Sequence, residues 1–247
     1  MDLGLTGRSA LVLGASGGLG LASAESLAEE GARVAIFARN AEKLEREAAR
    51  IGGHSIPGDV RDAAAIERAV RATVDTFGGL DIVVANGGGP PTSHARDLTA
   101  ADLEDAFRLL MLPVVNLVQA SLPYLKASGQ GRIVLIASMS VREPLPNLAL
   151  SNAIRPGVVG YMKTLATELA ADGITVNSVA PGRLATNRTI QVYGEHPPQE
   201  QLDMIPMKRF GRPRELGDVV AFLCSRQASY VSGSLISIDG GLTRSLT

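Results

Sequence analysis

The sequence predicts one α/β domain in which helices cover both faces of a doubly wound parallel β-sheet. Short aliphatic runs alternate with longer segments whose apolar residues recur at helical spacing. Strict alternation of strands and helices is typical of a parallel sheet covered on both faces. The chain of 247 residues has no long Ser/Gly/Pro-rich linker and no sequence repeat. This favours a single domain over residues 1–247.

Each expected strand is a short aliphatic run of the kind that forms a buried parallel strand. Helical spacing predicts helices at 18–30 and 62–78, and the charged run at 41–51 predicts a solvated helix. Residues 183–210 are the least regular segment and contain prolines, so we expect a lid over a substrate site there. The expected strands are 9–13, 33–38, 80–85, 132–137, 174–180 and 234–239.

The composition excludes several function classes. Lys and Arg number 24 and Asp and Glu number 25, so neither nucleic acid nor an anionic membrane is an expected partner. No uninterrupted apolar run is long enough to span a bilayer, and the N-terminus resembles a first strand more than a signal peptide. The single Cys224 lies in an apolar run, and His54, His94 and His196 are scattered. We therefore expect a buried thiol, no metal site and a cytoplasmic protein.

The first expected strand runs into the glycine-rich segment GASGGLG and then into a helix. Unpaired N–H groups and the positive end of a helix attract a phosphate, and the absence of side chains lets a diphosphate approach. Tight turns also demand glycine. The position after the first strand nevertheless favours dinucleotide binding and a Rossmann-type fold. The residues predicted to contribute are Gly14, Ser16, Gly17, Gly18, Leu19 and Gly20.

The spacing G-x-x-x-G-x-G resembles that of the short-chain dehydrogenase/reductase family, and further matches follow in order along nearly the whole chain. The closing segment VSGSLISIDGG resembles the last strand and turn of that family. The resemblance implies three more groups of cofactor contacts. They are Asp59 and Val60 at the adenine, Asn86, Gly87 and Gly88 after the fourth family strand, and Pro181, Gly182 and Thr186 beside the nicotinamide.

The end of the second strand predicts which nucleotide is bound. An acid there would bind the ribose 2′-hydroxyl and repel a 2′-phosphate, but this chain has Arg39 and Asn40. Arg39 offers a planar, permanent cation to a phosphate, which favours NADP(H) over NAD(H). A solvated loop arginine is the alternative. Gly17 stands where many NADP-preferring members of the family carry a second basic residue.

The family's catalytic positions are mostly substituted. The resemblance implies hydride transfer between the nicotinamide and a carbonyl or alcohol carbon. In the family a tyrosine moves the proton, a lysine lowers its pKa, a serine orients the substrate oxygen and an asparagine supports a water relay. Here Ser138 is retained, whereas Ser151, Arg155 and Leu110 replace the tyrosine, lysine and asparagine. We therefore expect Ser138, Ser151 and Arg155 to be the catalytic residues, and Arg155 also to hold the cofactor ribose.

These substitutions affect proton transfer more than cofactor binding. A serine hydroxyl is shorter and far less acidic than a phenol, and an arginine stays protonated and cannot relay a proton. Losing a positioned general acid costs about 10² to 10⁴ in rate. Pro156 disfavours helical geometry at Arg155 and could tilt the start of that helix. Tyr161 cannot take over, because its spacing from Lys163 does not place both groups on one helix face.

Three functions remain open. The first is an oxidoreductase similar to 3-oxoacyl-carrier-protein reductases, acting on a small carbonyl or alcohol. In that case Ser140 and Asn152 join the expected catalytic residues in polarising the substrate oxygen, and the proton comes from water or from His94, Tyr193 or His196. The second is a catalytically silent NADP(H)-binding sensor or scaffold.

The third function is a subunit whose partner completes the site. The apolar helix VVGYMKTLATEL predicts self-association into a dimer or tetramer, although core packing against the sheet would also explain it. A pure binder could fill the space above the nicotinamide with Leu110, Pro144 or lid residues, whereas an enzyme needs a cavity there.

Overall fold

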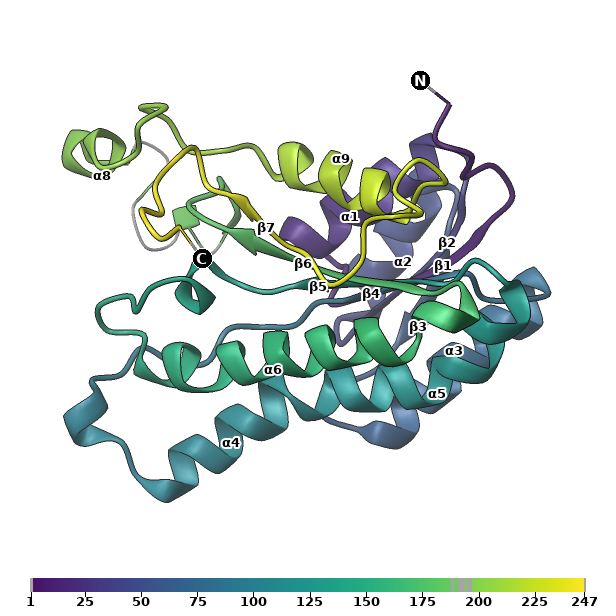
Figure 1. Ribbon diagram of the computed structural model, residues 1–247, viewed down its shortest axis with the longest axis horizontal. Helices are drawn as coiled ribbons and strands as arrows, with labels where there is room; N and C mark the ends of the chain where they lie inside the picture. The colour runs from purple at the N-terminus through teal and green to yellow at the C-terminus, as the bar shows by residue number, and fades with distance from the viewer. Residues whose placement is uncertain (1, 188, 191–193, 195–196, 247) are drawn as a thin grey trace.

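The computed structural model describes residues 2–187, 189–190, 194 and 197–246 (Figure 1). Within these residues, seven parallel strands form one sheet in the order β3-β2-β1-β4-β5-β6-β7. This arrangement confirms the predicted fold class. The strands are β1 (Ser9–Leu13), β2 (Arg33–Ala38), β3 (His54–Pro57), β4 (Ile82–Ala85), β5 (Arg132–Ile136), β6 (Thr175–Pro181) and β7 (Leu235–Ile238).

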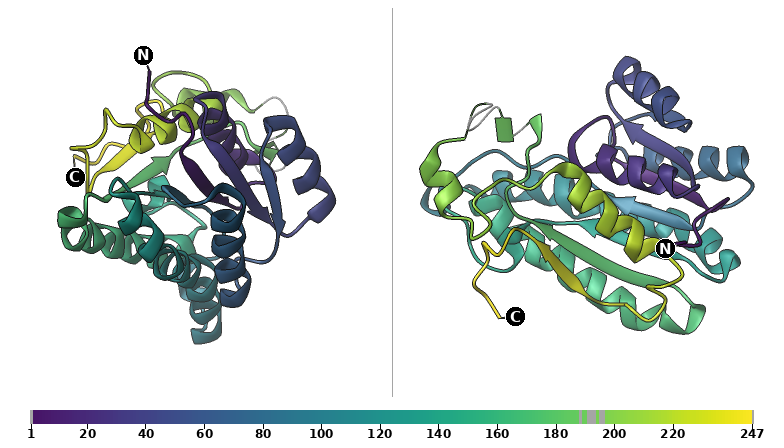
Figure 2. Two further views of the ribbon diagram at one scale, coloured as in Figure 1. Left: turned by 90° about the vertical axis from the view of Figure 1, so that its right-hand side faces the viewer. Right: turned by 90° about the horizontal axis from the view of Figure 1, so that it is seen from above.

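Helices cover both faces of the sheet. Figure 1 shows one group of helices above the sheet and a larger group below it, and Figure 2 shows the same layers from two further directions. The first group is α1 (Gly18–Glu29), α2 (Ala41–Ile51) and α9 (Pro213–Cys224). The second is α3 (Ala63–Phe77), α4 (Ala100–Leu110), α5 (Leu112–Ser128) and α6 (Ala149–Glu168), and the short α8 (Gln199–Asp203) lies apart from both.

The two hydrophobic cores follow from the alternation of side chains along the strands. In β1, Leu11 and Leu13 pack into the core beneath α3, α5 and α6, whereas Ala10 and Val12 pack into the core beneath α1, α2 and α9. Successive side chains of a strand point to opposite faces. A strand buried on both faces therefore needs apolar residues throughout, which is why SALVL reads as a continuous aliphatic run.

Local capping explains where the helices begin and end. The side chain of Asn40 accepts a hydrogen bond from the backbone N–H of Lys43, 2.9 Å away, and starts α2. Gly52 ends that helix with a φ of 65°, a conformation that favours glycine. Thr99 and Asp102 form a reciprocal capping box at the start of α4.

Strand β3 has no counterpart among the expected strands. It is a four-residue edge strand that ends in proline and is only partly buried. Short, polar edge strands lack the aliphatic run that identifies an interior strand. β4 is also shorter than expected, because Asp81 precedes it and its carboxylate accepts a hydrogen bond from the backbone N–H of Ser9 at 2.8 Å.

Helix α6 contains Pro156 but continues from Ala149 to Glu168 as one helix. The proline has no N–H to donate to the carbonyl of Asn152, four residues earlier, so one helical hydrogen bond is lost. The helix nevertheless places Ser151 and Arg155 four residues apart, on the same face.

One apolar helical stretch in the described part of the chain, Ala100–Ser128, is long enough to cross a membrane, with a mean hydropathy of 1.4. It comprises α4 and α5. α5 packs against α3 and strands β4 and β5, and α4 packs against α6. Core helices of water-soluble proteins have the same composition, so this stretch is weak evidence for a membrane.

Candidate functional site

The loop between β1 and α1 is shaped by the close approach of Asn86. The Asn86 side-chain amide donates to the carbonyl of Gly14 at 3.1 Å. A Cβ at Gly14 would lie 2.8 Å from the Asn86 amide nitrogen, and one at Gly20 would lie 2.6 Å from the same atom. Gly14 also has a φ of 62°. Because Gly14 and Gly20 have no side chains, the loop can lie directly against Asn86, the residue after β4. The Asn86 amide then holds the loop through its hydrogen bond to Gly14.

The N-terminus of α1 lies at the edge of this loop. Gly17 is its N-cap residue, and no described side chain caps the helix there. Helix N-termini carry unpaired N–H groups and a partial positive charge. Thr186 lies above the loop, since a Cβ at Gly18 would be 3.8 Å from its methyl carbon. The start of α1 is thus open to an anion and approached from one side by the segment after β6.

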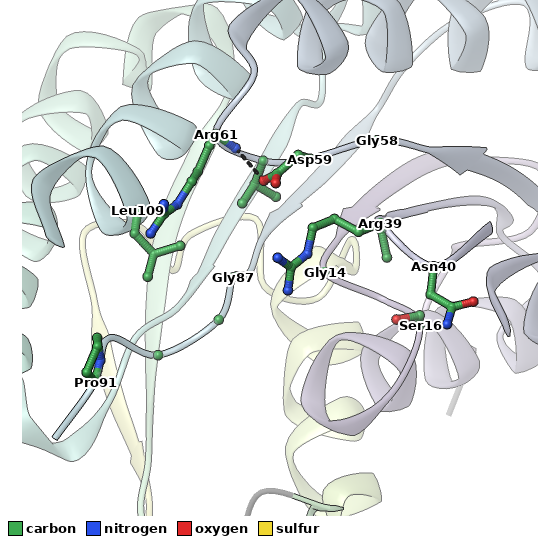
Figure 3. A pocket seen from close by; sticks show the side chains of 14 residues that line it. Gly14, Ser16, Arg39, Asn40, Gly58, Asp59, Arg61, Gly87, Pro91 and Leu109 are labelled. Atoms are coloured by element: carbon green, nitrogen blue, oxygen red, sulfur yellow. Dashed lines mark hydrogen bonds between the residues drawn. The ribbon is translucent and has the colours of Figure 1, made fainter. Parts of the chain in front are cut away.

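A cleft of about 800 Å³ opens at the carboxyl ends of β1, β2 and β4. In Figure 3, Arg39 reaches into it from the end of β2, with Ser16 and Asn40 on one side and Gly87 and Leu109 across from it. This is the end of an open parallel sheet where ligands bind. The residues expected to bind the cofactor that line the cleft are Gly14, Ser16, Arg39, Asn40, Asp59, Val60, Gly87 and Gly88.

Several cleft residues were not expected from the sequence. Arg61 follows the Asp59-Val60 pair, and its backbone N–H donates to the Asp59 carboxylate at 2.9 Å. Its side chain runs toward Leu109 (Figure 3). Arg61 could have been predicted from the sequence, because it directly follows the matched Asp59-Val60 pair. Leu109 offered no such signal, because it comes from a distant helix.

The remaining expected cofactor residues lie around the cleft. Leu19 is in the first turn of α1, while Pro181 ends β6 beside Ile238 of β7. Gly182 allows close packing, because a Cβ there would lie 2.5 Å from the Cβ of Asp239. Thr186 shares a hydrogen bond of 2.8 Å with the hydroxyl of Thr189.

The expected catalytic serines lie together, with Ser140 between them. The hydroxyls of Ser140 and Ser151 are 3.0 Å apart and hydrogen-bonded to each other. Their residues are only 3% and 4% exposed. The hydroxyl oxygen of Ser138 accepts the backbone N–H of Ser140 at 3.1 Å, and Ser138 is half-buried. Of the three hydroxyls, that of Ser138 is the most accessible.

Arg155 lies one helical turn after Ser151 and donates to the carbonyl of Ala137 at 3.2 Å. It lines a small cavity of about 20 Å³ together with Asn86 and Leu110. Leu110 is 7% exposed and ends α4. The side chain at the family's asparagine position is therefore apolar and packed beside the guanidinium.

Asn152 holds the loop before α6. Its amide oxygen accepts the backbone N–H of Leu145 at 3.1 Å, and its amide nitrogen donates to the Leu145 carbonyl at 2.9 Å. Both polar atoms of this side chain are thus occupied by the loop. Asn152 positions the chain beside the site.

The candidate proton donors have different placements. His94 is exposed on the loop after β4, whereas Tyr193 and His196 lie outside the described residues. Burial raises the pKa of Tyr161, and the nearby Glu168 adds to the shift, which makes this phenol a poorer acid near neutrality.

Burial also raises the pKa of the Cys224 thiol to about 12. Among the described residues, no group of three or more His, Cys, Asp or Glu side chains could hold a metal ion.

Comparison with known proteins identifies the relatives of this chain. A family model described as enoyl-(acyl carrier protein) reductase matches residues 14–243. The 3-oxoacyl-(acyl-carrier-protein) reductase FabG of Vibrio cholerae is 34% identical over 244 residues, covering 97% of this chain and 99% of the relative.

Solved structures give the same result. The L-sorbose reductase of Gluconobacter frateurii, complexed with NADPH and L-sorbose, has a TM-score of 0.94 at 31% identity and covers 100% of both chains. YwfH, an NADPH-dependent reductase involved in bacilysin biosynthesis, has a TM-score of 0.93 at 27% identity, covering 97% of this chain and 99% of the other.

Together, the fold, the glycine loop and these relatives define a Rossmann-type α/β protein of the oxidoreductase class. The chain belongs to the short-chain dehydrogenase/reductase family. The resemblance in the sequence is thereby confirmed.

Proposed function

We propose that the protein is an NADP(H)-dependent oxidoreductase that interconverts a carbonyl and an alcohol on a small molecule. The observation that carries this proposal is the environment of Arg39. It is exposed at the end of β2, lines the cleft, and has no hydrogen-bond or ion-pair partner among the described residues. A permanent cation at the position where an acid would select NAD suits the 2′-phosphate of NADP(H). The NADPH complex of the similar L-sorbose reductase supports this choice.

The cleft fits the rest of the dinucleotide. Side chains at Gly14 and Gly20 would collide with Asn86, so the loop presents bare backbone. The N-terminus of α1 has no side-chain cap among the described residues and can receive the diphosphate. Asp59 and Val60 line the far part of the cleft, where they are suited to contact the adenine.

When bound, the nicotinamide supplies or accepts the hydride. Ser138 is the group best placed to bind the substrate oxygen. Its oxygen accepts the Ser140 N–H, and its O–H can donate to the substrate oxygen. Arg155 contributes a fixed positive charge that stabilises negative charge on the substrate oxygen and holds ribose hydroxyls. Because neither group is a good acid, the proton comes from water or from a loop residue.

A catalytically silent NADP(H)-binding sensor or scaffold is the second candidate. Two observations favour it. The Ser151 hydroxyl is buried against Ser140, and Leu110 has replaced a polar side chain beside Arg155. In this case the cleft keeps its affinity for the cofactor while the substrate position lacks a proton donor.

Turnover separates the two candidates. NADPH absorbance is followed with a panel of ketones, ketoacyl thioesters, quinones and sugars, using the wild type, Ser138→Ala and Arg155→Ala. NADPH oxidation that disappears in both variants supports the enzyme. Tight NADPH binding without turnover of any panel member supports the sensor. No affinity for any nicotinamide nucleotide excludes both.

We also propose a homo-oligomer, a dimer or tetramer, acting in the cytoplasm, with residues 183–210 as the substrate lid. Leu103, Phe107 and Leu112 are exposed apolar side chains on α4 and α5, next to the apolar α6. Burying them between copies would remove apolar surface from water. Sedimentation of the purified protein with and without NADPH tests the assembly.

A further inference from the structure

Lys43 lies against the glycine loop, although it belongs to the next βα unit. The Asn40 cap fixes the first turn of α2 by accepting the Lys43 N–H. From this turn the half-buried lysine side chain runs toward α1. Its ammonium nitrogen lies 3.1 Å from the position that a Cβ on Gly17 would occupy, and its Cε lies 3.9 Å from it. The ammonium thus lies directly beside Gly17, and a side chain at position 17 would make it shift by a few tenths of an ångström.

The ammonium of Lys43 has no ion-pair partner in the described part of the chain. Among the described residues it makes no hydrogen bond or ion pair. Glu47 of α2, whose side chain is 13% exposed, already forms salt bridges with Arg46 and Arg50. Gly17 caps the N-terminus of α1, where the helix is partially positive. A cation held at the positive end of a helix is unfavourable unless an anion binds between them.

Arg39, which lines the cleft, is a second cation that has no hydrogen-bond or ion-pair partner among the described residues. Ser16 and Asn40 line the cleft beside it and add neutral hydrogen-bonding groups (Figure 3). A phosphate monoester carries nearly two negative charges at neutral pH. One guanidinium and one ammonium match that charge.

We propose that Lys43 is the second cation of the 2′-phosphate site and that it determines, with Arg39, the preference for NADP(H) over NAD(H). The inference rests on the proposed NADP(H) function and adds a specificity residue to it. Gly17 lacks the basic side chain that many relatives carry, and the ammonium from α2 replaces that charge in space. Without a side chain at Gly17, the Lys43 ammonium can lie directly against the glycine loop.

Binding measurements test this role directly. Dissociation constants for NADPH and NADH are measured by calorimetry for the wild type, Lys43→Met and the matched control Arg46→Gln. The control removes one exposed charge from the same helix, and that charge is paired with Glu47 and not placed against Gly17. Lys43→Met is expected to weaken NADPH binding about tenfold, the effect of one partly solvated charge-assisted hydrogen bond, and to leave NADH within about twofold. Arg46→Gln is expected to change neither by more than about twofold.

A charge relocation completes the test. Gly17 has a φ of 170°, extended backbone that any residue adopts. Adding Gly17→Arg to Lys43→Met is expected to restore most of the NADPH affinity, because the cation returns to the same place from the loop. Competition by adenosine 2′,5′-bisphosphate and by ADP shows whether the loss concerns the 2′-phosphate. Thermal unfolding confirms that each variant is folded.

The outcomes are distinguishable. If the wild type binds NADPH and Lys43→Met weakens NADPH and NADH equally, or neither, Lys43 has no role in choosing the nucleotide, while the proposed function stands. If the wild type binds no nicotinamide nucleotide, the proposed function fails, and the role of Lys43 fails with it.

Discussion

The buried hydroxyl pair of Ser140 and Ser151 predicts a strong energetic coupling between the two positions. Each hydroxyl has the other as its only hydrogen-bond partner in the described part of the chain, and both residues are almost fully buried. Replacing one serine by alanine leaves the other hydroxyl without a partner and away from water. Such a group costs about 1 to 3 kcal/mol, whereas removing both partners together is nearly neutral.

The expected magnitudes follow from this asymmetry. Ser140→Ala and Ser151→Ala should each lower the free energy of unfolding by about 1.5 kcal/mol, which is a fall of about 3 to 6 °C in Tm for a chain of this length. The double variant should lose only about 1 kcal/mol instead of the additive value of about 3 kcal/mol. The coupling energy is therefore about 2 kcal/mol.

Urea unfolding of the four proteins, with and without NADPH, measures the cycle. Additive losses would show that water reaches the two hydroxyls, and the assignment of a closed serine pair would then be wrong. Activity gives a second measurement. Because Ser138 is the least buried of the three serines, Ser138→Ala should reduce turnover more than Ser151→Ala does.

Three further predictions concern Arg39, Gly20 and Glu215. Arg39→Asp should shift the preference from NADPH toward NADH, and an unchanged ratio of dissociation constants would identify Arg39 as a surface charge only. Gly20→Ala should abolish nucleotide binding and destabilise the fold, because its Cβ would lie 2.6 Å from the Gly14 carbonyl oxygen; a variant with wild-type affinity would contradict this loop geometry. The Arg209 guanidinium and the backbone N–H of Arg212 donate hydrogen bonds to the Glu215 carboxylate. These bonds lower the pKa of Glu215 from 4.5 to about 2. This carboxylate therefore stabilises the fold above pH 4.5 and loses its effect as the pH falls toward 2. Glu215→Gln should cost about 0.5 to 1 kcal/mol at neutral pH and progressively less in acid, and a constant difference across the pH range would rule out the ion pair as its cause.

The sequence was sufficient to predict those parts of the fold that are determined by neighbouring residues. The glycine loop, the buried strands and the charged helix at 41–51 all follow from residues close together in the chain. Strand β3 escaped prediction because its pairing with β2, and not its own composition, makes it a strand. The residues expected to be catalytic on α6, Ser151 and Arg155, keep their predicted spacing of four residues, because Pro156 does not interrupt the helix.

Contacts between distant segments could not be predicted. The bond between Ser140 and Ser151 joins the turn after β5 to α6, and its existence depends on how α6 is rotated against the sheet. The ammonium of Lys43 reaches Gly17 only because β1 and β2 are neighbours in register. The sequence predicts Asn152 to be a site residue, yet both of its amide atoms form hydrogen bonds with the backbone of Leu145.

Leu184 and Gly211, at the two ends of the segment after β6, lie beside each other. The two residues form a parallel bridge, and the backbone N–H of Ala185 donates to the Gly211 carbonyl at 2.8 Å. Since the two ends are tied to each other, the length of chain between them can change at small entropic cost, about 0.6 kcal/mol per doubling. Exchanging the part of this segment between Thr186, which lies over the glycine loop, and the buried Ile205 is therefore a practical route to new substrates, because both of its ends are held by the rest of the fold.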